Sequence, residues 1–141
     1  MTDTADDLTY GGFDEVVGLK LTEVTGDRVT GRFEAVPRLH QPYGIVHGGV
    51  LCSVVETTAS VGGSVWFGER GHVVGVSNHT NFLRAVREGV LDVEATPVQR
   101  GRTQQLWQVT VHDAAGKLVA QGQVRLANVT DPAAIGAPAR G

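Results

Sequence analysis

The sequence predicts an α+β fold in which one long helix is covered by an antiparallel sheet of about five to six strands. Three observations favour this fold class. The longest apolar segment, Gly48 to Trp66, has helical periodicity, strand-like segments lie on both sides of it, and turn residues separate those segments. The 141 residues are the length of a single domain.

Two strands are predicted before the helix. Val16–Thr25 and Arg28–Val36 are rich in β-branched residues, and the Gly26-Asp27 pair between them is typical of a hairpin turn. A loop that contains Pro37 and Pro42 then leads to the helix, because proline interrupts regular structure. The helix itself has room for roughly five turns at ~3.6 residues per turn.

Four more strands are predicted after the helix, separated by turns that contain glycine. They cover Val73–Arg84, Val90–Arg100, Thr103–Asp113 and Lys117–Val129. In the last of them apolar and polar side chains alternate, as in a strand with one buried face. The apolar set is Leu118, Ala120, Val124 and Leu126, and the polar set is Gln121, Gln123 and Arg125.

Composition limits both the domain organisation and the class of function. Residues 13–129 form the predicted domain, and residues 1–12 and 130–141 are expected to be flexible ends. The net charge of -3 argues against nucleic-acid binding, and the single cysteine, Cys52, excludes a disulfide framework or a multi-cysteine metal site. There is no signal peptide and no run of 18 apolar residues, so we expect a cytoplasmic protein without a membrane span.

The predicted helix lacks a solvated face. An apolar stripe should pack on the sheet, and it comprises Val50, Leu51, Val54, Thr58, Val61 and Val65. The opposite side carries small residues and one charge, and it comprises Gly49, Cys52, Glu56, Ala59, Ser60 and Gly63. One small sheet cannot enclose a helix on all sides, so a second subunit is the expected cover. The sequence therefore predicts a homo-oligomer.

Glu56 is the candidate catalytic residue, because removing a carboxylate from bulk water is costly unless the carboxylate is paired or serves a function. On the pattern alone, an ion pair with an arginine across a subunit contact is as good an interpretation as catalysis. The loop from His40 to Gly49 favours catalysis. Its glycines allow a ligand to approach the unpaired N–H groups at the start of the helix, which suit a carbonyl oxygen that develops negative charge. A polarising helix end and a carboxylate are the two parts that acyl transfer requires.

Several motifs together resemble the phenylacetate-pathway (PaaI-like) branch of the hotdog thioesterase superfamily. They are His40-Gln41-Pro42, His47-Gly48-Gly49-Val50, Glu56, Asn78 to Arg84, Gly101-Arg102-Thr103 and Gly116 to Ala120. The resemblance runs from about Phe13 to Asn128 and implies a hotdog fold, in which a curved antiparallel sheet wraps one central helix. Other branches have an aspartate in place of Glu56, so the glutamate resembles the hydroxybenzoyl-CoA and dihydroxynaphthoyl-CoA thioesterase type.

The resemblance implies a role for each matching residue in acyl-CoA hydrolysis. Glu56 matches the catalytic nucleophile or general base, and the backbone N–H of Gly48 matches the group that polarises the thioester carbonyl. Gln41 matches a glutamine that positions the thioester or the water, and His47 matches a histidine that shapes the site. Ser60 matches a hydroxyl that contacts the water or the acyl group.

Coenzyme A carries phosphates, so basic and hydrogen-bonding groups are expected near the mouth of the site. The candidate substrate-binding residues are Gly49, Asn81, Arg84, Arg87, Arg102 and Thr103. The resemblance also implies a site between subunits, and homodimers that pair into a homotetramer. No metal and no cofactor is expected, since coenzyme A is part of the substrate.

Two alternatives to hydrolysis remain. A hydratase or dehydratase of acyl thioesters would use a histidine with a carboxylate, but the predicted helix contains no histidine. A non-catalytic acyl-CoA-binding protein would normally need an output domain, for which a chain of this length leaves no room. The sequence does not decide the acyl group.

Overall fold

A computed structural model of the chain describes residues 11–135, which form one curved antiparallel sheet around one long helix. The elements are α1 (Phe13–Val17), β1 (Lys20–Val24), β2 (Val29–Glu34), the 3-10 turn η2 (Pro37–Leu39), α2 (Gly48–Phe67), the 3-10 turn η3 (Gly68–Arg70), β3 (His72–Phe82), β4 (Val90–Arg100), β5 (Gln104–His112), β6 (Leu118–Val129) and the 3-10 turn η4 (Pro132–Ile135).

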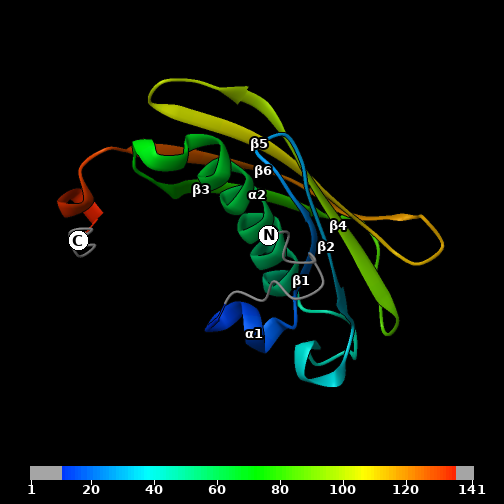
Figure 1. The fold of residues 1–141 in the computed structure, drawn as a ribbon. Helices are drawn as coiled ribbons and strands as arrows, with labels where there is room; N and C mark the ends of the chain where they lie inside the picture. The colour runs from blue at the N-terminus through cyan, green and yellow to red at the C-terminus, as the bar shows by residue number, and fades with distance from the viewer. Residues whose placement is uncertain (1–10, 136–141) are drawn as a thin grey trace.

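The six strands are ordered β1-β2-β4-β5-β6-β3, and every neighbouring pair is antiparallel. The sheet curves around α2, which lies across its concave face, and α1 lies near the N-terminal end of α2 (Figure 1). This arrangement confirms the predicted hotdog fold. Strands β1 and β3 are the two edges of the sheet, so each has one side that no described strand covers.

α2 begins at Gly48 because His47 caps it: the backbone of His47 is extended, and its side chain accepts a hydrogen bond from the Gly49 N–H. The predicted apolar stripe is buried against the sheet except at Val65, which is 47% exposed. Ala59 and Gly63, which we assigned to the opposite side, are buried instead. The sheet twists along the helix, and small residues let it approach closely.

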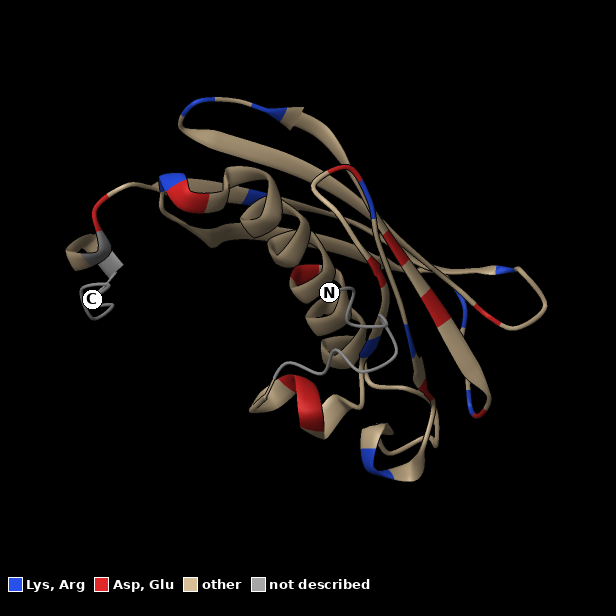
Figure 2. Cartoon of the chain, viewed as in Figure 1, with Lys and Arg blue, Asp and Glu red and all other residues tan. Residues whose placement is uncertain are grey.

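By length and composition α2 would suffice to cross a membrane, since the 18-residue window within Gly48–Arg70 has a mean hydropathy of 1.3. Half of that window is buried inside the fold, however, and α2 contacts all six strands. These contacts identify α2 as the core helix of the domain. Glu56 is the one charged residue along α2, as Figure 2 shows.

The predicted strands are confirmed with small shifts at their ends, and Val90–Arg100 has the predicted bounds. The first strand is wrong at its start, because Val16 and Val17 belong to α1 and the strand begins at Lys20. α1 ends where Gly18 adopts a left-handed conformation with φ of 80° and its N–H bonds to the carbonyl of Asp14. Only glycine adopts this conformation readily, so the chain turns there.

A buried polar network fixes the C-terminal half of α2 to the sheet. Gln105 on β5 is 1% exposed, and its Oε1 accepts a hydrogen bond of 2.8 Å from the indole of Trp107. Its Nε2 donates to the carbonyl of Gly63 on α2 (3.2 Å) and to Oδ1 of Asn128 on β6 (2.8 Å). Every group in this network has a partner, so it holds the helix in one register on the sheet.

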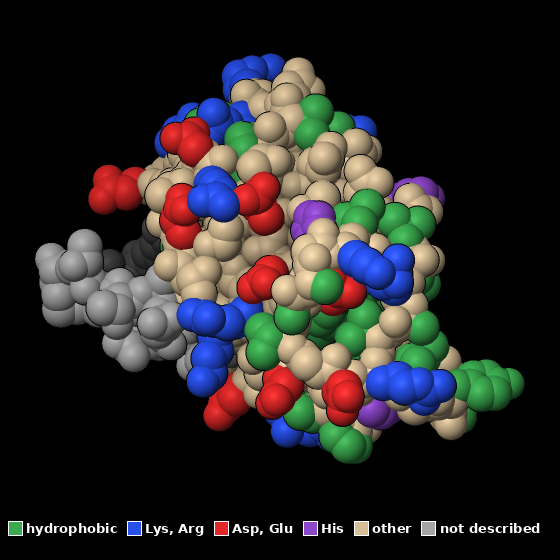
Figure 3. Space-filling model, turned by 90° about the vertical axis from the view of Figure 1, so that its right-hand side faces the viewer, with side chains coloured by type: hydrophobic (Ala, Val, Ile, Leu, Met, Phe, Trp, Pro, Cys, Tyr) green, Lys and Arg blue, Asp and Glu red, His purple; other side chains and the backbone are tan. Residues whose placement is uncertain are grey.

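Acidic and basic side chains are interspersed over the face that Figure 3 shows, without a large patch of one sign. Arg28 pairs with Glu94 at 2.6 Å and with Glu23 at 2.8 Å, and all three side chains are at least 40% exposed. The hydrogen bond and charge of Glu94, followed by those of Glu23, raise the pKa of the Arg28 guanidinium. Exposed pairs of this kind contribute little to stability.

Candidate active site

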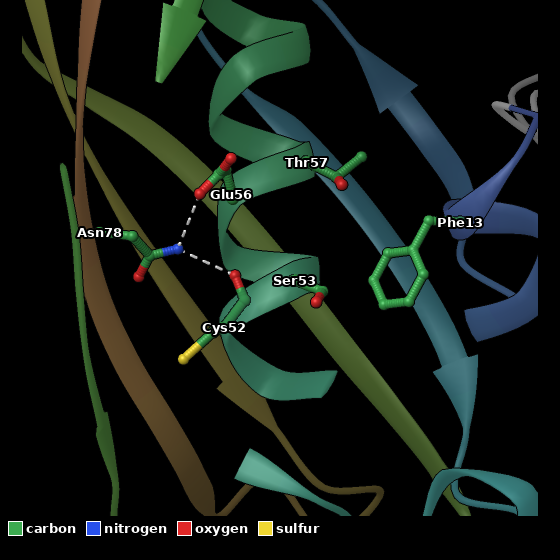
Figure 4. A pocket seen from close by; sticks show the side chains of 6 residues that line it. All are labelled: Phe13, Cys52, Ser53, Glu56, Thr57 and Asn78. Carbon is green, nitrogen blue, oxygen red and sulfur yellow. Dashed lines mark hydrogen bonds between the residues drawn. The ribbon is translucent and has the colours of Figure 1, made fainter. Parts of the chain in front are cut away.

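Glu56 lies on the side of α2 next to the edge strand β3, and it borders a pocket of about 480 Å³. The other lining residues are Phe13, Cys52, Ser53, Thr57 and Asn78 (Figure 4). Glu56 is exposed in the single chain, which corrects the expectation of a carboxylate sheltered from water. Among residues 11–135, no lysine or arginine forms an ion pair with it.

Two residues of the edge strand β3 surround the Glu56 carboxylate. Nδ2 of Asn78 lies 3.4 Å from Glu56 Oε1, and it donates a second hydrogen bond of 3.0 Å to the carbonyl of Cys52. Gly75 on the same strand has no side chain, and a Cβ added there would lie 3.3 Å from Glu56 Oε2. Strand β3 therefore offers the carboxylate an amide donor at Asn78, and the glycine leaves space for it.

Helix α1 forms the opposite wall of this pocket. Phe13 is 62% exposed, and its ring points toward the side of α2 that carries Ser53 and Thr57 (Figure 4). The next residue, Asp14, accepts a hydrogen bond of 2.7 Å from the Thr57 hydroxyl, so α1 is attached to α2 one residue from Glu56. Ser60 lies one turn further along α2 and shares a second hollow of about 330 Å³ with Glu56 and Asp14.

A separate pocket of about 300 Å³ lies at the N-terminus of α2. It is lined by Gln41, Ile45, Val46, Gly48, Leu51, Phe82, Leu83, Arg84 and Ala85. Glycine at position 48 leaves room for the Phe82 ring, from which an added Cβ would be 2.6 Å away. The Gly48 N–H has no acceptor among residues 11–135, whereas the Gly49 N–H bonds to Nδ1 of His47 at 2.8 Å. Gly48 therefore presents a free donor to this pocket.

The loop before α2 is held rigidly. Arg87 donates hydrogen bonds to the carbonyls of Tyr43 (2.9 Å) and Gly44 (3.4 Å), and its own carbonyl lies 2.7 Å from Nε2 of His40. The amide oxygen of Gln41 accepts from the Tyr43 N–H, and the Gln41 carbonyl accepts from the Gly44 N–H at 2.9 Å. Arg87, which we predicted as a coenzyme A ligand, thus supports the loop that carries Gln41.

Within one chain, the structure does not bring Glu56 and Gly48 to the same place. They are eight residues apart on one helix, which at ~1.5 Å per residue is about 12 Å along the axis. An attacking atom must come within roughly 3–3.5 Å of the carbonyl carbon. A glutamate side chain is too short to close that gap. One thioester carbonyl cannot meet both groups of a single chain.

The remaining predicted site residues are divided between the two ends of α2. Arg84 lines the Gly48 pocket, and Asn81 is exposed near the end of β3. Arg102 and Thr103 lie in the turn after β4, at the C-terminal end of α2. Asn128 holds this turn through hydrogen bonds to the carbonyls of Arg102 (3.1 Å) and Thr103 (2.9 Å).

Sequence reasoning missed several residues of the Glu56 pocket. Asn78 was part of a motif, but nothing in the sequence placed it beside Glu56, 22 positions away. Gly75 and Phe13 were also missed, because strand register and the position of α1 decide their contacts. The Asp14-Glu15 pair followed by Gly18 is a helix pattern that could have revealed α1.

Comparisons with known proteins identify the family of the chain. A sequence model of the thioesterase superfamily matches residues 43–120. Rv1847 of Mycobacterium tuberculosis, which carries an esterase name, is 44% identical over 120 residues, which are 83% of this chain and 86% of that protein. Its solved structure has a TM-score of 0.82 over 83% of this chain and 95% of that one.

Two further relatives carry more specific names. The structure of thioesterase HI1161 from Haemophilus influenzae is 30% identical, with a TM-score of 0.83 over 92% of each chain. The 1,4-dihydroxy-2-naphthoyl-CoA hydrolase of Listeria monocytogenes is 27% identical over 108 residues, which are 77% of this chain and 88% of that protein. The hotdog fold, the matched region and these relatives together show that the chain belongs to the thioesterase superfamily and is a thioester hydrolase.

Proposed function

We propose that the chain hydrolyses an acyl-CoA thioester to a carboxylic acid and coenzyme A, with Glu56 as the reacting carboxylate. The observation that carries this proposal is the position of Glu56. It is the one charged residue of α2, it borders a pocket, and an amide donor contacts it while no described cation pairs with it. The coenzyme A ester in the name of the Listeria relative supports the substrate class.

The chemistry needs a donor for the carbonyl oxygen and a group that delivers oxygen to the carbonyl carbon. The free N–H of Gly48 at the positive end of α2 would stabilise the oxyanion. Glu56 would either attack the carbon, to form an anhydride that water then hydrolyses, or take a proton from the attacking water. In both routes the C–S bond breaks and the coenzyme A thiolate leaves and is protonated.

Because Glu56 and Gly48 of one chain are too far apart, the proposed site combines Glu56 of one copy with Gly48 and Gln41 of another. The edge strand β3 supports such a pairing, since it is 11 residues long, open on one side, and carries the exposed Val76 and Phe82. Two copies paired along β3 would form a dimer, and two dimers a tetramer.

The phosphates of coenzyme A would bind basic groups outside the reacting centre. Arg84 already lines the pocket of Gly48. Arg102 and Thr103 lie at the far end of α2 from Gly48. In this proposal they contact the substrate at a site whose Gly48 belongs to another copy of the chain. The exposed ring of Phe13 lines the Glu56 pocket, where it would contact the acyl group.

A thiol-release assay over aromatic, branched and straight-chain acyl-CoAs tests the function. The proposal expects release of free coenzyme A with at least one class of acyl group. Tight binding without release would instead favour an acyl-CoA-binding protein, and hydration of an enoyl-CoA without release would favour a hydratase.

Mixed oligomers test the shared site. Gly48→Pro removes the proposed donor, and proline suits this first helical position after the extended His47. Gly48→Ala is the matched control, since it adds a Cβ against Phe82 but keeps the N–H. Random mixing of the inactive G48P and E56Q chains should restore roughly a quarter of the sites if each site uses two copies, and none if each site lies in one chain.

A further inference from the structure

Among the described residues, Asn78 has the one side chain that hydrogen-bonds both Glu56 and the main chain of the helix that carries it. Its Nδ2 donates to Glu56 Oε1 at 3.4 Å and to the Cys52 carbonyl at 3.0 Å, as the dashed lines in Figure 4 mark. In an α-helix the carbonyl of residue 52 also accepts the N–H of residue 56. Asn78 therefore contacts the Glu56 carboxylate and the carbonyl that accepts the Glu56 N–H.

The orientation of the Asn78 amide follows from the chemistry of its neighbours. An amide group has two N–H donors on nitrogen and only acceptors on oxygen. Nδ2 faces a carbonyl and a carboxylate, which are both acceptors, and Oδ1 receives the Thr80 hydroxyl at 2.7 Å. A reversed amide would place its oxygen against two other oxygens, so this orientation is the favourable one.

The Glu56 carboxylate has few other restraints. Gly75 has no side chain to confine it, and the carboxylate borders an open pocket. Without Asn78, the exposed Glu56 side chain could adopt other rotamers and leave its place beside β3. Reaction rates depend steeply on the position of the attacking group, so a restraint of this kind affects turnover more than binding.

We propose that Asn78 is a positioning residue that holds the Glu56 carboxylate toward the bound thioester, and that the Thr80 hydroxyl helps to hold the Asn78 side chain in place. This inference rests on the proposed hydrolysis. The 3.4 Å contact is long for a hydrogen bond, as catalytic contacts often are before substrate binds. The donor is neutral, so it orients the carboxylate without supplying a counter-charge.

Four substitutions test the inference in the full-length protein by kcat and KM for thioester hydrolysis. Asn78→Ala should lower kcat by roughly 10- to 100-fold and change KM less than about threefold. Asn78→Asp keeps the shape and the acceptor for Thr80 but replaces the donor with a second carboxylate, so it should be slower than the alanine variant. Thr80→Val should lower kcat by roughly three- to tenfold, and Thr80→Ser, which keeps the hydroxyl, should restore it.

A merely structural role predicts that kcat falls only together with Tm, because both replacements also remove the hydrogen bond to the Cys52 carbonyl. Such a parallel loss, or an unchanged kcat in both variants, would overturn the inference. A double-mutant cycle adds a second check: in the E56Q background, Asn78→Ala should have no further effect on the residual rate. If it slowed E56Q as much as the wild type, Asn78 would not act through Glu56.

The outcomes also separate this inference from the proposed function. An inactive E56Q together with a fully active N78A would refute the role of Asn78 and leave hydrolysis intact. A fully active E56Q, or a wild type that releases no thiol from any acyl-CoA, would refute the proposed mechanism and the inference with it. Melting temperatures of all variants distinguish a lost restraint from a damaged fold.

Discussion

Gly75→Ala is a small change that should lower turnover without weakening the fold. The new Cβ would lie 3.3 Å from Glu56 Oε2, which is closer than an ordinary contact, and 3.4 Å from its Cδ. The carboxylate must then move by a few tenths of an ångström. A displacement of about 1 Å can cost on the order of 100-fold in rate, so we expect kcat to fall by roughly three- to tenfold.

The same substitution should leave the stability unchanged or raise it. The φ of Gly75 lies outside the left-handed region, and alanine is favoured over glycine in a strand by roughly 0.5–1 kcal/mol. Steady-state thiol release gives kcat, and a thermal melt gives Tm. Ser77→Ala, an exposed change on the same strand, is the control. An unchanged kcat would refute the placement of the carboxylate, and a parallel loss of kcat and Tm would mean that the fold was damaged.

Three further changes probe the fold, α1 and the subunit contact. Gln105→Met removes the acceptor of the buried Trp107 indole, so the free energy of unfolding in urea should fall by roughly 2–4 kcal/mol. A loss below about 0.5 kcal/mol would contradict the role of the buried polar network. Thr57→Val breaks the hydrogen bond to Asp14, so hydrogen exchange of the α1 amides should become faster with little change in global stability. Unchanged exchange would show that this bond does not attach α1. Val76→Lys places like charges near each other in a symmetric β3 pairing, so light scattering should report monomers, and these monomers should be inactive in thiol release. An active monomer would exclude the shared site.

The sequence predicted the fold well because its main signals are local. The apolar periodicity and the His47-Gly48-Gly49 start defined α2 to within one residue, and alternation defined β6. The burial of α2 was predicted less well. Ala59 and Gly63 were interpreted as an open face because they are small, but small residues also allow the sheet to approach.

The candidate site was predicted in its parts and not in its arrangement. Glu56 and Gly48 were found from residue type and position, and the structure places each beside a pocket. Their separation follows from helix geometry and was available from the sequence. The contact between Asn78 and Glu56 was not, because it depends on how β3 lies against α2, which no local pattern encodes.

The most direct test of the account compares Glu56→Gln with Glu69→Gln, which makes the same change at an exposed glutamate just beyond α2. Glutamine keeps the shape of residue 56 but can neither attack the thioester nor accept a proton from water. With the best acyl-CoA of the panel, kcat of E56Q should fall by roughly 100- to 10,000-fold while substrate binding and Tm are retained, and E69Q should match the wild type. An E56Q enzyme that turns over within about threefold of the wild type would contradict the role of Glu56 in hydrolysis.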